Sequence, residues 1–96
     1  MEINVKSLKF EADEKLVEFV QKKVERIEKF TTGTVQKVEV SLENLKEGKK
    51  AKIQLLFAGD PHLVERTCDT FENAITAACD AMKERLTRAK EKIQEK

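Results

Sequence analysis

Apolar and polar residues alternate in three short segments of the chain, which is the pattern expected of β-strands with one buried face. The first segment lies near the N-terminus, where Ile3 and Val5 alternate with polar neighbours. The phase then slips, so that Leu8 and Phe10 carry the next apolar pair. Because a bulge inserts one extra residue and shifts the alternation, this segment is predicted to be a strand with a bulge.

Three further strands are predicted in the middle of the chain. They span residues 34–42, 50–58 and about 62–67. The polar stretch 43–49 predicts a hairpin loop with a mobile tip between the first two of them. The sequence Ala58-Gly59-Asp60-Pro61 predicts a tight turn before the last strand, because glycine accepts a positive φ and proline fixes its own φ.

Two longer segments place apolar residues every three or four positions, which predicts amphipathic helices. The first helix is expected from about Asp13 to Phe30, with Gly33 close behind as a stop signal. The second is expected to begin after Asp69, which is predicted to be its N-cap with Glu72 as the capping-box partner. This helix continues almost to the end of the chain.

The order of these elements is β-α-β-β-β-α, and it predicts an α+β fold. A four-stranded sheet with one apolar face and two amphipathic helices most simply packs into two layers, with both helices on one face of the sheet. A chain of 96 residues is long enough for one hydrophobic core. Residues 1–96 are therefore expected to form a single domain.

The composition narrows the classes of function. The 19 Lys and Arg nearly balance the 18 Asp and Glu, so any signal for a polyanionic partner must come from how the charges are arranged. No apolar run resembles a signal peptide or a membrane span, so a cytoplasmic location without a membrane partner is expected. Cys68 and Cys79 lack the spacing of a zinc or redox motif and are predicted to be free thiols, with Cys79 on a core face.

Catalysis finds little support in the sequence. His62 is the one histidine, and it is expected to face solvent at the start of a strand. No serine or cysteine has the context of an activated nucleophile, and no phosphate-binding loop or metal-binding motif is present. The chain is therefore not expected to be an enzyme, or to use a metal, a cofactor or a small-molecule substrate.

The charges on the helices carry more information. At 100° per residue, the first helix has a basic stripe beside an acidic one, and the second has a basic stripe beside its core face. The basic stripes contain Lys15, Lys22, Arg26 and Lys29 on the first helix and Arg85, Arg88, Lys92 and Lys96 on the second. One interpretation is a solvated surface with pairs four residues apart, such as Glu18 with Lys22. The other is an RNA-binding surface, formed if two parallel helices bring both stripes to a common side.

Particular segments resemble a known family. Residues 16–30 resemble the first helix of the hibernation-promoting factor and ribosome-associated inhibitor family. Residues 69–75 resemble the opening of that family's second helix, in which an aspartate, an aromatic residue and an Ala-Ile pair recur. The basic segment 85–92 adds to the likeness, which covers essentially the whole chain.

The resemblance implies a fold similar to a double-stranded RNA-binding domain. It also implies binding to the 30S subunit through 16S rRNA, in the channel for mRNA and tRNA, with inhibition of translation by occlusion. Carried over by position or taken from the stripes, the predicted RNA-binding residues are Lys22, Lys23, Arg26, Lys29, Arg85, Arg88 and Lys92. The sequence departs from the family at Ala81 and Glu84, where basic residues are usual.

The length resembles the short members of the family. Self-driven ribosome dimerisation is therefore not implied, although dimerisation together with a second ribosome-dimerising factor stays compatible with it. The alternative function is a non-catalytic protein-interaction or regulatory module that uses the polar face of the sheet or an edge strand and does not bind RNA.

Overall fold

The computed structural model describes residues 2–28, 35–57 and 59–94, with side chains described up to residue 89. The elements follow one another as β1 (Glu2–Leu8), α1 (Glu14–Glu25), β2 (Lys37–Leu45), β3 (Gly48–Phe57), β4 (Asp60–Cys68) and α3 (Phe71–Gln94). This is the predicted β-α-β-β-β-α order. None of the described helices is both long and apolar enough to span a membrane.

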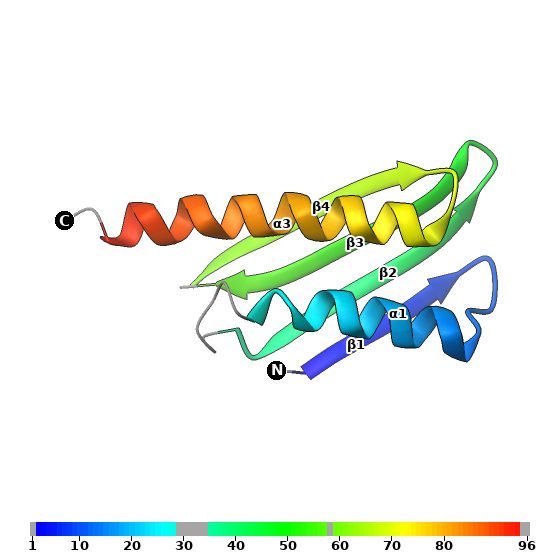
Figure 1. Cartoon of the computed structure of the whole chain (residues 1–96), viewed down its shortest axis with the longest axis horizontal. Helices are drawn as coiled ribbons and strands as arrows, with labels where there is room; N and C mark the ends of the chain where they lie inside the picture. Colours follow the sequence, from blue (N-terminus) through cyan, green and yellow to red (C-terminus); the bar gives the residue numbers. More distant parts are fainter. Residues whose placement is uncertain (1, 29–34, 58, 95–96) are drawn as a thin grey trace.

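The four strands form one sheet in the order β1-β2-β3-β4 (Figure 1). β1 pairs with β2 in parallel, whereas β2 with β3 and β3 with β4 are antiparallel. A parallel pair needs a long crossover connection, and α1 lies in the connection between β1 and β2. β4 is an edge strand, and it accommodates Pro61 because one side of an edge strand does not donate to a neighbour.

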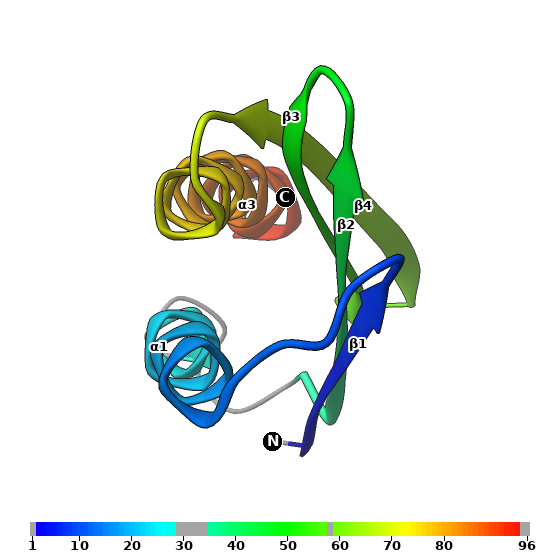
Figure 2. The same cartoon turned by 90° about the vertical axis from the view of Figure 1, so that its right-hand side faces the viewer.

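Both helices lie on one face of the sheet, side by side (Figure 2). Every second strand residue points toward them, and the hydrophobic core fills the space between the two layers. Its largest fully buried side chains include Ile27, Leu42, Ile53, Ile75, Met82 and Leu86. The predicted two-layer α+β architecture is confirmed. We call the other side of the sheet, which carries Lys6, Lys37, Glu39, Leu56 and Leu63, the open face.

The bulge predicted in the first strand is wrong. β1 pairs with β2 without interruption from Glu2 to Leu8. The slip in the apolar alternation comes after the strand, where Lys9 adopts a positive φ of 66° and turns the chain back toward the helices. Phe10 then stacks on Phe71, with 4.4 Å between the ring centroids. The shifted apolar residue thus marks the end of the strand and not an extra residue inside it.

The long hairpin loop predicted for residues 43–49 is also wrong. β2 and β3 remain paired up to Leu45 and Gly48, so only residues 46 and 47 form the turn. Gly48 is required there for a steric reason, since an added Cβ would lie 2.7 Å from the backbone oxygen of Cys68. The predicted second turn is present between β3 and β4, and Gly59 has a φ of 83° in it.

Both helix starts are capped by side chains, one of them at a residue other than predicted. Asp13 precedes α1, and its Oδ1 accepts a hydrogen bond from the Leu16 backbone N–H at 2.8 Å. At α3 the cap is Thr70 and not Asp69, because the Thr70 hydroxyl oxygen accepts from the Asn73 N–H at 3.1 Å. Asp69 instead accepts from the Asn73 side-chain amide at 2.9 Å, which lowers the pKa of its carboxyl group.

The first helix is shorter than predicted. α1 ends at Glu25 with Arg26 as its C-cap, and a turn closed by the Ile27 N–H on the Val24 oxygen follows. Ile27 is still fully buried, because this turn keeps it on the core side. Residues 29–33, where the predicted end at Phe30 and the stop at Gly33 fall, lie outside the described residues.

Candidate nucleic-acid interface on the helices

The outer side of α1 presents three cations to solvent. Lys15, Lys22 and Arg26 are exposed, and we call them the α1 basic face. Val20 and Val24 on the opposite side of this helix are fully buried, which fixes the rotation of the helix and turns the α1 basic face outward.

No carboxylate neutralises the α1 basic face within the described part of the chain. The ion pair between Glu18 and Lys22, suggested by their spacing, is not formed in the structure. Lys15 and Arg26 likewise form no ion pair with any described residue. These three charges are therefore available to a ligand without first breaking a contact inside the protein.

Cys79 of α3 lies near cations from both helices. Lys23 on α1 and Lys83 on α3 both act electrostatically on Cys79, and each lowers the pKa of its thiol. Burial is the larger effect and raises the pKa of Cys79 to about 11, since the residue is 1% exposed. We call Lys23, Cys79 and Lys83 the helix seam. The Lys23 ammonium also lies 5.7 Å from the centre of the Phe19 ring.

Arg85, another cation of α3, lies on the side of this helix that faces β4. Arg85 donates a hydrogen bond from Nε to Nδ1 of His62 in β4, at 3.2 Å. Residues 83 and 85 are separated by 200° around the helix, so Arg85 points away from α1 while Lys83 lies at the helix seam. Arg88 follows one turn later. The structure thus joins Lys22, Lys23 and Arg26 in one region and places Arg85 and Arg88 on another flank.

The structure shows what Ala81 and Glu84, the two departures from the family pattern, contact. Glu84, where a basic residue is usual, accepts a hydrogen bond from the Arg88 guanidinium at 2.7 Å, four residues away. Ala81 is partly buried against the core. Because of its contact with Glu84, the Arg88 guanidinium is already paired inside the protein. Lys29 and the side chain of Lys92 lie outside the described residues.

His62 is not the solvent-facing residue that the sequence suggested. It is 8% exposed, because β4 begins at Asp60 and places residue 62 on the side of the strand that faces α3. Burial lowers the pKa of His62, the nearby Arg85 guanidinium lowers it further, and Asp60 opposes both. A buried histidine that accepts a hydrogen bond from a cation is held in its neutral form.

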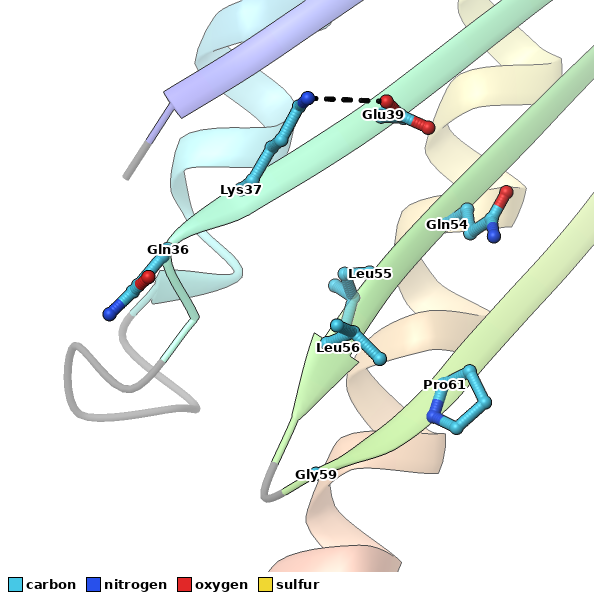
Figure 3. Close-up of a pocket in the computed structure, with 8 residues that line it drawn as sticks. All are labelled: Gln36, Lys37, Glu39, Gln54, Leu55, Leu56, Gly59 and Pro61. Carbon is cyan, nitrogen blue, oxygen red and sulfur yellow. Dashed lines mark ion pairs between the residues drawn. The ribbon is translucent and has the colours of Figure 1, made fainter.

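The open face of the sheet contains a shallow hollow of about 460 Å³ (Figure 3). Leu56, Pro61 and Gln36 line it, together with Lys37 and Glu39, which form an exposed ion pair at 3.5 Å. The residues that line this hollow include no serine, threonine, cysteine or histidine that could act as a nucleophile. Among the residues that the structure describes, no three His, Cys, Asp or Glu side chains gather so that they could hold a metal ion.

The fold and the charged helix layer together define a small α+β domain with a surface suited to a polyanion. The model of the family described as Sigma 54 modulation protein / S30EA ribosomal protein matches residues 3–94, and the chain belongs to this family. It is a family of ribosome-associated modulation proteins. The family resemblance stated from the sequence is confirmed.

Solved structures support the same fold. The N-terminal domain of Thermus thermophilus Protein Y aligns with a TM-score of 0.81 and 22% identity, over 92% of this chain and 98% of that one. A ribosomal subunit interface protein from Coxiella burnetii aligns with a TM-score of 0.87 and 16% identity, over 94% of this chain and 98% of that one. Among curated protein sequences, none matches this chain significantly.

One cation of the helix seam, Lys83, was not among the predicted RNA-binding residues. Helical periodicity places Lys83 on the flank opposite Arg85, but the periodicity of one helix does not say which flank meets the other helix. The packing of α1 against α3 brings both Lys23 and Lys83 close enough to Cys79 to act on its thiol.

Proposed function

We propose that this protein binds the 30S ribosomal subunit through 16S rRNA, in the channel that holds mRNA and tRNA, and inhibits translation by occluding those sites. It acts in the cytoplasm and makes or breaks no covalent bond. Its membership in a ribosome-associated family supports this function. The observation that carries the proposal is the α1 basic face, whose exposed cations have no carboxylate partner among the described residues.

An exposed cation gains affinity for RNA mainly by releasing counterions from the phosphate backbone. Lys15, Lys22 and Arg26 satisfy that condition, and Lys23 at the helix seam extends the same surface toward α3. Arg88 satisfies it less well, because it must first leave Glu84. The buried core beneath both helices keeps the helices that carry these side chains in fixed relative positions, as a steric plug requires.

The first test is binding to purified 30S subunits at several salt concentrations, measured by sedimentation. About four to six phosphate contacts predict a slope of roughly −3 to −5 in a plot of log K against log salt. Pelleting that does not depend on salt, or no pelleting at low salt, would contradict the proposal.

The second test separates occlusion from mere attachment. The protein is added to 30S subunits that carry a labelled short mRNA and a tRNA, and the release of each label is measured by filter binding. Occlusion predicts competitive release of both. Stable co-binding of mRNA, tRNA and the protein would contradict a location in the channel.

Protein interaction through the open face is a second candidate function, favoured by its exposed leucines. Leu56 is 62% exposed and lines the hollow. Leu63 is 42% exposed and pairs with Gln54, which also lines it. The test is a pull-down after nuclease treatment with the wild type and with Leu56→Gln. A partner that is lost with Leu56→Gln and free of rRNA would support this function, and an rRNA-dependent pull-down would contradict it.

A further inference from the structure

Among the described residues, His62 and Arg85 form the one side-chain hydrogen bond that joins β4 to α3. His62 stands opposite Leu55 in the pairing of β4 with β3, and its ring faces α3. Arg85 is exposed, yet its Nε lies 3.2 Å from Nδ1 of the buried imidazole. An exposed arginine is thus attached by its inner nitrogen to a buried residue 23 positions earlier.

The direction of this hydrogen bond fixes the chemistry of the histidine. An arginine nitrogen can only donate, so Nδ1 of His62 must be the acceptor and the ring proton must sit on Nε2. Nε2 is buried and has no hydrogen-bond partner in the described part of the chain. An unpartnered buried N–H opposes folding, so the position is not explained by stability alone.

The hydrogen bond through Nε leaves the outer end of Arg85 unoccupied. Neither terminal nitrogen of Arg85 has a partner among the described residues, and together these nitrogens present parallel N–H groups that match a phosphate. The neighbouring arginines differ in this respect. Arg88 donates to Glu84 at 2.7 Å, and Arg66 donates to the backbone oxygen of Glu65 at 2.6 Å.

We propose that His62 is a positioning residue that holds Arg85 by Nε and thereby preorganises its terminal nitrogens for one phosphate group of RNA. The proposal rests on the proposed function, since the RNA is taken to be that of the 30S subunit. Holding a long side chain in place before binding lowers the entropy lost on binding. The same arginine without His62 would still be charged but would have to be ordered by the RNA.

The test is a double-mutant cycle on 30S affinity with His62→Leu, Arg85→Gln and the double variant. If His62 acts through Arg85, His62→Leu weakens binding roughly two- to tenfold, the effect of ordering one flexible side chain. In the Arg85→Gln background the same change has no further effect. His62→Asn keeps an acceptor near the position of Nδ1 and is expected to restore most of the affinity.

A second measurement needs no RNA and shows whether the hydrogen bond is formed. In the free protein, ¹⁵N NMR is expected to show the Nε2–H tautomer of His62 and slow hydrogen exchange at Arg85 Nε, which becomes fast in His62→Leu. If His62→Leu lowers 30S affinity equally in the wild-type and Arg85→Gln backgrounds, or if Arg85 Nε exchanges rapidly in the wild type, the positioning role of His62 is overturned while the proposed function stands. Failure of the wild type to bind 30S subunits would overturn the proposed function and this role with it.

Discussion

Removing two charges of the α1 basic face should change the salt dependence of ribosome binding and little else. The variant is Lys22→Gln with Arg26→Gln, because glutamine retains good helix propensity and much of the side-chain length. Both residues are exposed, and neither has an ion-pair partner among the described residues. Any loss of binding then reflects contacts with the ligand and not contacts inside the protein.

The size of the change in salt dependence follows from the number of cations removed. Each cation that neutralises a phosphate contributes about 0.7 to 0.9 to the slope of log K against log salt, so the double variant should reduce the slope by about 1.4 to 1.8. With 1 M salt as the reference at which this contribution vanishes, binding at 0.1 M should be roughly 25- to 60-fold weaker. The loss of folding stability should be at most about 1 kcal/mol, from weakened interactions with the C-terminal end of the α1 dipole.

The assay is sedimentation with purified 30S subunits at three salt concentrations, together with urea unfolding of each protein. Lys6→Gln with Lys37→Gln is the matched control, because it changes the net charge equally, from +1 to −1, on the open face of the sheet. The control should retain the wild-type slope. Equal reductions of the slope in both variants would show that net charge, and not the α1 basic face, drives binding, and would refute the reasoning.

Three further predictions concern the fold and its titratable groups. The pKa of His62 is lower in the folded protein, so the unfolded chain binds more protons, and the stability that His62 contributes is fully present above pH 6.5 and falls as the pH drops through the folded pKa. The urea midpoint of the wild type should therefore fall more between pH 7.5 and 5.5 than that of His62→Asn. Parallel changes in the two proteins would contradict this. In the native protein, Cys68 should react with a thiol reagent at pH 8, whereas Cys79 should react only after unfolding, because burial raises the pKa of Cys79 to about 11. Rapid labelling of both cysteines in the native protein would contradict this prediction. Gly48→Ala should lower the free energy of unfolding by about 1 to 3 kcal/mol, because the alanine Cβ would lie 2.7 Å from the Cys68 backbone oxygen. An unchanged urea midpoint would show that the hairpin adapts to the added methyl group.

Local patterns predicted the elements well but placed several of their ends wrongly. Capping at residues 69 and 70 shows why: Asp69 and Thr70 are both good caps, and the choice between them depends on hydrogen bonds to Asn73 that form only in the folded helix. The hairpin between β2 and β3 gives a second case. Its polar residues look like a loop, yet Glu43 and Asn44 lie in paired strands because the sheet continues beyond the apolar core.

Some features of the candidate site could likewise be predicted from the sequence, whereas others depended on tertiary packing. Periodicity along α1 was sufficient to place Lys22 and Arg26 on one outward side, because that side is defined against residues of the same helix. Burial of His62 could not be predicted, because it depends on where β4 begins and on α3 lying over it. The family resemblance supplied the expected class of partner, the ribosome, which no pattern of charge could supply by itself.

By itself, the sequence determined which residues form strands and helices, which side of each element is apolar, and hence the two-layer α+β fold. These properties are set by neighbours a few residues apart, so they can be seen in the order of the side chains. Only the tertiary structure decided which flank of α3 meets α1. That choice brings Lys23 and Lys83 to Cys79 and turns Arg85 toward His62. Contacts between elements depend on how two helices and a sheet pack together, and no single periodicity contains that information.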